Sequence, residues 1–225
     1  MIGRVKTLEE REISRAVIRR LPRYYRYLGE LLENGVERIS SNDLSKRMKV
    51  TASQIRQDLN NFGGFGQQGV GYSTEVLQQE IGKLIFPESN LRAVLVGTGN
   101  MGIPIANFVS KETEGIDLIG LFDNDNALVG NHLIGFEIQP ISRIENFCKE
   151  NSVDVIIVCT DRQTAEDIAP EIIKTGVKGI WNFSHFDFSL FDHSLIVENV
   201  HLRDNLMALS YRVTHNDEKD TLQQG

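Results

Sequence analysis

Apolar residues recur at helical spacing in the first sixty positions of the chain. The stretch LPRYYRYLGELLENG, residues 21–35, predicts a helix with one apolar side, and its last two residues tolerate positive φ and end it. A second helix is predicted after Ser41, whose hydroxyl can cap it, with Leu44 and Met48 facing inward. A third begins with the capping box TASQ at Thr51. Three short helices with a tight turn before the third are typical of a helix-turn-helix.

The third helix has a polar outer side. Its apolar positions, which we expect to be buried, are Ala52, Ile55, Leu59 and Phe62. The positions between them carry amide and guanidinium groups, which can make paired hydrogen bonds to base edges in the major groove. They are Ser53, Gln54, Arg56, Gln57, Asn60 and Asn61. A solvated helix surface explains the same pattern, so this helix alone leaves both interpretations open.

A glycine-rich stretch, FGGFGQQGVGYST, follows the third helix. Gly66 and Gly69 flank Gln67-Gln68, which predicts a β-hairpin with a two-residue tip. A hairpin directly after a recognition helix is the wing of a winged-helix domain, while a plain surface hairpin is the alternative. The predicted DNA-binding residues are Lys46, Arg47, Ser53, Gln54, Arg56, Gln57, Asn60 and Tyr72.

The second half of the chain alternates strand and helix patterns. Residues 92–97 predict a buried strand and IPIANFVS a helix, with G-x-G-x-x-G between them at Gly97, Gly99 and Gly102. The first glycine permits a tight turn, the second lets the backbone approach a pyrophosphate, and the third lets the helix lie close to the strand. A Rossmann-like domain without a ligand is the alternative.

A second strand, residues 116–125, carries an acidic residue where a dinucleotide fold needs one. Asp123 stands 21 residues beyond Gly102, where a carboxylate accepts hydrogen bonds from the adenosine ribose and repels a 2′-phosphate. The pattern therefore favours NAD(H) over NADP(H).

Three more strands are predicted at residues 153–160, 177–183 and 194–200. Ligands of such sheets lie beyond the carboxyl ends of the strands, although a residue there can equally face solvent. The candidate cofactor-binding residues are Gly97, Thr98, Gly99, Asn100, Met101, Gly102, Asp123, Cys159, Thr160, Asp161 and Asn182, with Phe183 beside them. The predicted fold class is α/β, with a winged-helix domain over residues 1–86 and a Rossmann domain over residues 87–200.

Charge is divided unevenly between these two parts. The net charge of the 225 residues is −7, yet residues 1–86 hold 14 Lys and Arg against 10 Asp and Glu, and the remainder holds 10 against 21. A basic half that binds nucleic acid and an acidic half with another partner explain this asymmetry. The chain lacks a long apolar run and a secretory signal, so we expect a cytoplasmic protein without a membrane partner.

Residues for catalysis or metal binding do not form a recognisable set. Cys148 and Cys159 lack metal spacing, so neither zinc nor a disulfide is expected. His132, His185 and His193 fall in predicted loops, His215 lies in a polar tail, and His201 stands alone near the end of a helix. We expect no enzyme, and an oxidoreductase with a fused helical domain is the less favoured alternative.

The order of these motifs matches a known family. The stretches RLPRYYRYL, SSNDLSKRMKVTASQIRQDLNNFGGFG, VGTGNMG, FDND and GIWNF, over residues 13–211, resemble the bacterial redox-sensing transcriptional repressor family Rex. The resemblance implies a homodimer whose C-terminal helix, within residues 201–225, is swapped between subunits. It also implies that operator DNA is held by the free or NAD⁺-bound protein and released when NADH binds.

Several positions depart from the family pattern. Gln57 and Gln67-Gln68 stand where basic residues are usual, and Cys159-Thr160-Asp161 replaces a TVP motif. Phe108, a candidate cofactor contact, replaces a tyrosine, and His201 replaces an aspartate that would pair with the retained Arg26 as a switch. A carboxylate at Asp161 favours the cationic ring of NAD⁺, so we expect a weakened NADH response. A regulator that holds NAD as a structural ligand, or answers to another ligand, is the alternative.

Overall fold

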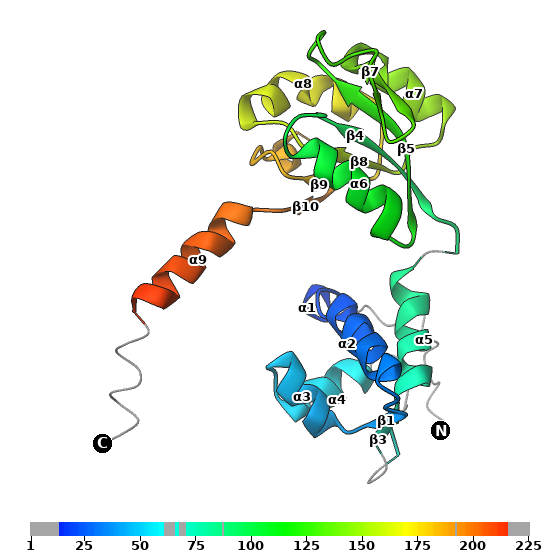
Figure 1. Ribbon diagram of the computed structural model, residues 1–225, viewed down its shortest axis with the longest axis vertical. Coiled ribbons are helices and arrows are strands. Elements are labelled where there is room, and N and C mark those ends of the chain that lie inside the picture. The colour runs from blue at the N-terminus through cyan, green and yellow to red at the C-terminus, as the bar shows by residue number, and fades with distance from the viewer. Residues whose placement is uncertain (1–13, 61–65, 68–70, 87, 192, 216–225) are drawn as a thin grey trace, which may run out of the picture. The chain divides into compact units, whose positions relative to one another are not determined.

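The computed structural model describes residues 14–60, 66–67, 71–86, 88–191 and 193–215. The chain divides into two compact units, Met1–Glu88 and Ser89–Gly225, two residues beyond the expected boundary. Each of the two units, which Figure 1 draws as ribbons, has a hydrophobic core of its own.

The first unit combines helices with a small antiparallel sheet. Its sheet has the order β1-β3-β2, and β2 with β3 forms the predicted hairpin. Gln67 is the last residue of β2 rather than part of the tip, because it pairs with Gly71, and positions 68–70 lie outside the described residues. The elements are α1 (Arg15–Ile18), α2 (Leu21–Glu33), β1 (Arg38–Ile39), α3 (Ser41–Met48), α4 (Ala52–Asn60), β2 (Gly66–Gln67), β3 (Gly71–Ser73) and α5 (Thr74–Ile85).

The ends of the helices follow local side-chain chemistry. The hydroxyl of Ser40, not of Ser41, accepts a hydrogen bond from the Asp43 N–H at 3.0 Å, so the predicted cap was wrong by one residue. Ser40 takes the cap because its backbone is extended, at φ −83° and ψ 156°. The turn before α4 places Lys49 in the left-handed region at φ 54°. The N–H of Gln54 donates to the Thr51 hydroxyl at 3.1 Å, which is one half of the predicted capping box.

A buried carboxylate that the sequence pattern did not single out joins α4 to α2. Asp58 is fully buried, and the Arg20 guanidinium donates to both of its oxygens, at 2.6 and 2.8 Å. The Tyr24 hydroxyl and the Gln54 amide also donate to Asp58, each at 2.8 Å. Burial by itself raises the pKa of Asp58, but the hydrogen bonds from Arg20, Gln54 and Tyr24 outweigh it and hold that pKa below its usual range.

The second unit is built on a seven-stranded sheet of order β10-β9-β8-β4-β5-β7-β6. Every pairing is parallel except that of β6 with β7. The six parallel strands have the order of a dinucleotide-binding Rossmann sheet, with the crossover at β4. The strands are β4 (Leu91–Val96), β5 (Ile116–Asp123), β6 (His132–Leu133), β7 (Phe136–Pro140), β8 (Val155–Val158), β9 (Gly179–Asn182) and β10 (Ile196–Asn199).

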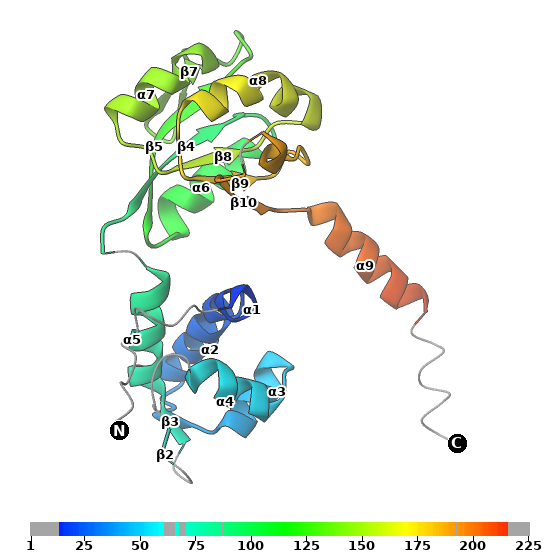
Figure 2. The same cartoon turned by 180° about the vertical axis from the view of Figure 1, so that it is seen from behind.

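Helices cover the two faces of this sheet unequally. Alternate residues of β4 point to opposite faces: Val94 packs with α7 and α8, while Ala93 packs with α6 (Figure 2). The helices are α6 (Gly102–Glu112), α7 (Ile144–Glu150), α8 (Arg162–Lys174) and α9 (Leu202–Thr214), with short 3₁₀ turns η2 (Ile141–Arg143) and η3 (Phe188–Leu190).

The last helix buries none of its own residues. Every residue of α9 is exposed within the chain, including Leu206 at 66% and Met207 at 61%. His201 immediately precedes this helix, so the expectation that it lies near the end of a helix was wrong.

Candidate functional site

A cleft of about 450 Å³ opens at the carboxyl ends of β4, β5 and β8. This is the edge of a parallel sheet where nucleotide ligands bind. Residues from all three strand ends line it, namely Gly97, Gly99, Asn100, Met101, Asp123, Asn124, Asp125, Leu128, Cys159, Thr160, Asp161 and Thr164. Eight of the eleven candidate cofactor residues predicted from the strand ends and the glycine motif line this cleft.

Each of the three glycines in the motif has its own structural role. Gly97 has φ +92°, a conformation that side-chain-bearing residues rarely adopt. A Cβ on Gly102 would stand 1.7 Å from the carbonyl oxygen of Gly97, so only glycine lets α6 start this close to the loop. A Cβ on Gly99 would meet nothing within 4 Å, which leaves that side of the loop open toward the cleft.

Asp123 holds the glycine loop in place. It is 5% exposed, and its Oδ2 accepts hydrogen bonds from the Thr98 N–H at 2.6 Å and the Thr98 hydroxyl at 2.7 Å. Its Oδ1 accepts from the Asp125 N–H at 3.0 Å. The contact with a ribose stays a prediction, and the tie to Thr98 is a second role that the motif spacing did not indicate.

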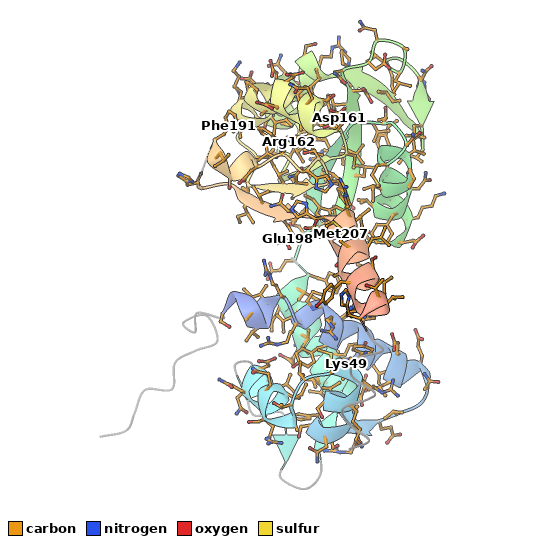
Figure 3. All side chains as sticks on the ribbon, turned by 90° about the vertical axis from the view of Figure 1, so that its left-hand side faces the viewer. Lys49, Asp161, Arg162, Phe191, Glu198 and Met207 are labelled. Atoms are coloured by element: carbon orange, nitrogen blue, oxygen red, sulfur yellow. The ribbon has the colours of Figure 1, made fainter. Side chains whose placement is uncertain are left out.

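The end of β8 brings a hydroxyl and a carboxylate to the cleft. The Thr160 hydroxyl oxygen is buried and has no hydrogen-bond partner in the described chain. Asp161 caps α8, because its carboxylate accepts from the Thr164 N–H at 3.0 Å and from the Thr164 hydroxyl at 2.8 Å (Figure 3). The hydrogen bond from the Thr164 N–H lowers the pKa of Asp161, so its carboxylate is ionised at neutral pH. Burial raises the pKa of the neighbouring Cys159 thiol to about 12, which keeps that thiol protonated.

Four predicted cofactor residues do not line the cleft: Thr98 and Gly102 belong to the glycine loop, while Asn182 and Phe108 lie elsewhere. Asn182 is fully buried and its amide is occupied, donating to the Phe186 carbonyl and to Asn199 Oδ1 and accepting from Ser184. Its amide ties the end of β9 to β10, and its contact with a cofactor stays a prediction. Phe108 lies on α6 at 41% exposure and does not line the cleft.

The predicted switch residues have local partners. Arg26 is exposed on α2, 4.0 Å from the Glu30 carboxylate and 5.2 Å above the ring of Tyr27. His201 is not alone: its ring stacks on that of His185 at 4.9 Å between centroids, with 2.9 Å between the two Nδ1 atoms.

The helix-turn-helix presents most of its predicted DNA-binding residues to solvent. Lys46, Arg47, Ser53, Arg56, Gln57 and Asn60 are exposed. The Arg56 guanidinium donates to the Ser41 hydroxyl at 3.0 Å, which links α4 to the start of α3. Lys49, in the turn between the two helices, is an exposed cation that the predicted set omitted (Figure 3).

Two members of the predicted DNA-binding set have other roles. Tyr72 is 8% exposed and packs in the core of the first unit, and its contact with DNA stays a prediction. Gln54 is half-buried and its amide donates to Asp58, so that group is used inside the fold. Asn61 and Phe62 lie outside the described residues.

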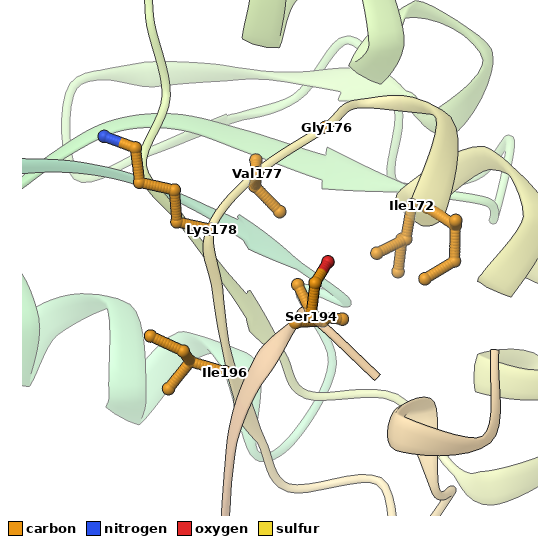
Figure 4. Close-up of a pocket in the computed structure, with 8 residues that line it drawn as sticks. Ile172, Gly176, Val177, Lys178, Ser194 and Ile196 are labelled. Carbon is orange, nitrogen blue, oxygen red and sulfur yellow. The ribbon is translucent and has the colours of Figure 1, made fainter. Parts of the chain in front are cut away.

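Another cavity, of about 360 Å³, lies at the opposite edge of the sheet (Figure 4). It lies between the end of α8 and the starts of β9 and β10, and isoleucines 172, 173 and 196 line it. Among the described residues, no three His, Cys, Asp or Glu side chains are placed to hold a metal ion. No helix in the described part of the chain is both long and apolar enough to cross a membrane.

The fold and the two surfaces define a winged-helix protein joined to a Rossmann dinucleotide-binding unit. Residues 12–60 match the family described as "Putative DNA-binding protein N-terminus", and residues 88–186 match the family "CoA binding domain". The redox-sensing transcriptional repressor Rex of Caldicellulosiruptor saccharolyticus is 45% identical over 91% of this chain and 93% of its own. That of Clostridioides difficile is 46% identical over 91% of this chain and 97% of its own.

Solved structures show the same similarity. The repressor RSP, crystallised with β-NAD⁺ and operator DNA, has a TM-score of 0.83 and 44% identity over 96% of this chain and 99% of its own. The same protein with β-NADH has a TM-score of 0.84 and 42% identity over 95% of this chain and 100% of its own. The chain therefore belongs to the Rex family of redox-sensing transcriptional repressors.

Proposed function

We propose that this protein is a transcriptional repressor that binds operator DNA through its winged helix and releases it when NADH binds in the glycine-loop cleft. The observation that carries the proposal is the presence, in one chain, of an exposed helix-turn-helix and a Rossmann cleft at the crossover strand. Its relatives are transcriptional repressors, and we propose no catalytic role for this chain. The repressor acts in the cytoplasm as a homodimer, for which the exposed apolar residues of α9 supply a pairing surface.

The residues of the cleft fit a dinucleotide. Gly99 leaves open space where a pyrophosphate approaches the start of α6, and the unpartnered Thr160 hydroxyl offers a hydrogen bond on the side of β8. The adenosine half would lie toward Asp123 and the nicotinamide half toward Asp161, because the ligand straddles the crossover strand β4.

The test is a titration of labelled duplex DNA, selected from a random pool on the full-length protein, in the presence of NAD⁺ or NADH. We expect tight binding with NAD⁺ and release with NADH. Equal DNA affinity with both forms would contradict the proposal and leave the dinucleotide as a structural ligand.

Replacing Arg56 by alanine is expected to weaken binding to the selected DNA by about 1–3 kcal/mol, the usual loss for one side chain that contacts a base edge. Lys149→Ala is the matched control, because it also removes one positive charge but lies on α7. Gel-shift titrations of both variants against selected and scrambled DNA measure the effect. An equal loss on both DNAs would assign Arg56 to the phosphate backbone, and no loss would remove it from the interface.

A second candidate function is a regulator with a blunted response to NADH. It is favoured by the carboxylate of Asp161 in the cleft, because this ionised group attracts the cationic ring of NAD⁺ but not the neutral ring of NADH. Among the described residues, no Lys, Arg or His nitrogen lies within 4.0 Å of the Asp161 carboxylate to offset that charge.

The variant Asp161→Asn removes the charge but keeps the cap of α8, since asparagine caps helices as well as aspartate does. We expect the affinity ratio of NADH to NAD⁺ to rise several-fold, with thermal stability nearly unchanged. Calorimetry measures both affinities, and Asp167→Asn, on the same helix but outside the cleft, is the control. An unchanged ratio would mean that Asp161 acts only as a helix cap.

A further inference from the structure

The threonine of the glycine motif joins the glycine loop to the end of the neighbouring strand β5. Both donors of Thr98, its backbone N–H and its side-chain hydroxyl, reach the same carboxylate oxygen, Oδ2 of Asp123. The N–H of Gly97 donates to the Phe122 carbonyl at 2.9 Å, so consecutive residues of the loop are bonded to consecutive residues of β5. Thr98 is 2% exposed, so its hydroxyl is used inside the fold rather than offered to a ligand.

The carboxylate of Asp123 has little acceptor capacity left for a ligand. The two oxygens of an ionised carboxylate accept hydrogen bonds at about four positions. The two donors of Thr98 occupy both positions on Oδ2, and the Asp125 N–H occupies one position on Oδ1. Among the described residues, nothing donates to the other position on Oδ1, and Asp123 lines the cleft. The carboxylate in this orientation can therefore accept from one ribose hydroxyl.

The orientation of this carboxylate matters because its charge has no cationic neighbour. In the part of the chain that the structure describes, no Lys, Arg or His nitrogen lies within 4.0 Å of Asp123. A carboxylate that could turn would move its charge away from a 2′-phosphate and tolerate that group more easily. The hydroxyl of Thr98 opposes such a turn, because Oδ2 would lose one of its two donors.

We propose that Thr98 is a positioning residue for dinucleotide specificity, whose hydroxyl holds the Asp123 carboxylate where it accepts one ribose hydroxyl and excludes a 2′-phosphate. The backbone N–H at position 98 is available from any residue except proline, whereas the second bond requires a hydroxyl. Serine or threonine can therefore hold the carboxylate in this way, and alanine or valine cannot. This inference rests on the proposed function in taking the cleft as the NAD(H) site, but it does not depend on DNA release.

Calorimetric titration of the full-length protein with NADH and with NADPH tests the proposal. Thr98→Val keeps the shape of the side chain and the backbone N–H but removes the hydroxyl. We expect the ratio of NADH affinity to NADPH affinity to fall about tenfold, which is at the low end of the loss for one hydrogen bond to a charged group. Thr98→Ser keeps the hydroxyl and should keep the ratio of the natural protein. An unchanged ratio in Thr98→Val would overturn the proposal.

A ligand without the ribose 2′-hydroxyl separates positioning from damage to the glycine loop. NADH built on 2′-deoxyadenosine cannot donate that hydroxyl to Asp123. Its affinity should be nearly equal for the natural protein and Thr98→Val, whereas the affinity for NADH should fall several-fold in the variant. An equal loss for both ligands would mean that Thr98 only supports the loop, and would contradict the proposal. Thr113→Val, at the end of α6 and outside the cleft, is the matched control.

The outcomes of this experiment differ from those of the DNA titration. A protein that binds NADH but does not release its DNA would contradict the proposed function, while the affinity ratios of Thr98→Val and Thr98→Ser would still decide the role of Thr98. A natural protein that binds neither NADH nor NADPH would overturn both. A natural protein that releases DNA with NADH but shows the same ratio as Thr98→Val would overturn the role of Thr98 alone.

Discussion

Replacing Gly102 by alanine is expected to abolish dinucleotide binding and to destabilise the Rossmann unit by about 3 kcal/mol. The added methyl group would stand 1.7 Å from the Gly97 carbonyl oxygen and 2.8 Å from its carbonyl carbon. Both atoms belong to the backbone of the glycine loop, so no side chain can move away to make room. The loop and the start of α6 must separate, and the N–H groups that would face a pyrophosphate lose their arrangement.

Gly99→Ala is the matched comparison for this prediction. Its methyl group meets no protein atom within 4 Å, so the stability of the unit should stay within about 0.5 kcal/mol of the natural protein. Dinucleotide binding should still weaken, because the methyl group occupies the side of the loop that opens toward the cleft. Thermal unfolding followed by the fluorescence of Trp181, the single tryptophan, reports on this unit, and calorimetry measures binding. Equal stability of the two alanine variants would contradict the close approach at Gly102.

Asp58→Asn is expected to destabilise the winged-helix unit by about 3–5 kcal/mol at neutral pH, the usual loss when one partner of a buried ion pair is removed. Arg20 would keep its charge with 22% of its side chain exposed and lose its bidentate partner. Tyr24 and Gln54 would also lose the ionised acceptor that they share. Asp43→Asn, at an exposed carboxylate on α3, should cost much less.

The effect of Asp58 should depend on pH with a definite sign. Because the folded protein holds the pKa of Asp58 below its usual range, the carboxylate contributes its stability above about pH 4 and loses it as pH falls further. The difference between the natural protein and Asp58→Asn should therefore shrink below pH 4. Urea unfolding followed by circular dichroism measures it, with Trp181 fluorescence marking the separate transition of the other unit. A difference that stays constant from pH 7 to pH 3 would contradict this role.

Local sequence patterns predicted the elements that depend on near neighbours. Helical spacing and capping residues identified α3 and α4, and the glycine motif placed the cleft between β4 and α6. These signals act over fewer than ten residues, so a single sequence contains them. The cap of α3 is Ser40, where the sequence predicted Ser41, so these local signals place the end of a helix to within about one residue.

The features that the sequence did not indicate depend on distant partners. Arg20 and Asp58 are 38 residues apart, Asn182 meets Asn199 across two strands, and His185 meets His201 through a 16-residue separation. Each of these polar residues fits a solvent-exposed position when its neighbours in the sequence are considered alone. Only the packing of separate segments turns them into a buried ion pair, a strand tie and a stacked pair.

Helix α9 is exposed along its whole length within its own chain. A helix of 13 residues is marginal in water when it stands alone, and α9 buries no residue within its own chain. If a second copy covers its apolar side, folding of this segment and association are one equilibrium, governed by mass action. The helical content of residues 202–214 then rises and falls with the protein concentration. Dilution therefore unfolds this segment, as a denaturant unfolds the two cores.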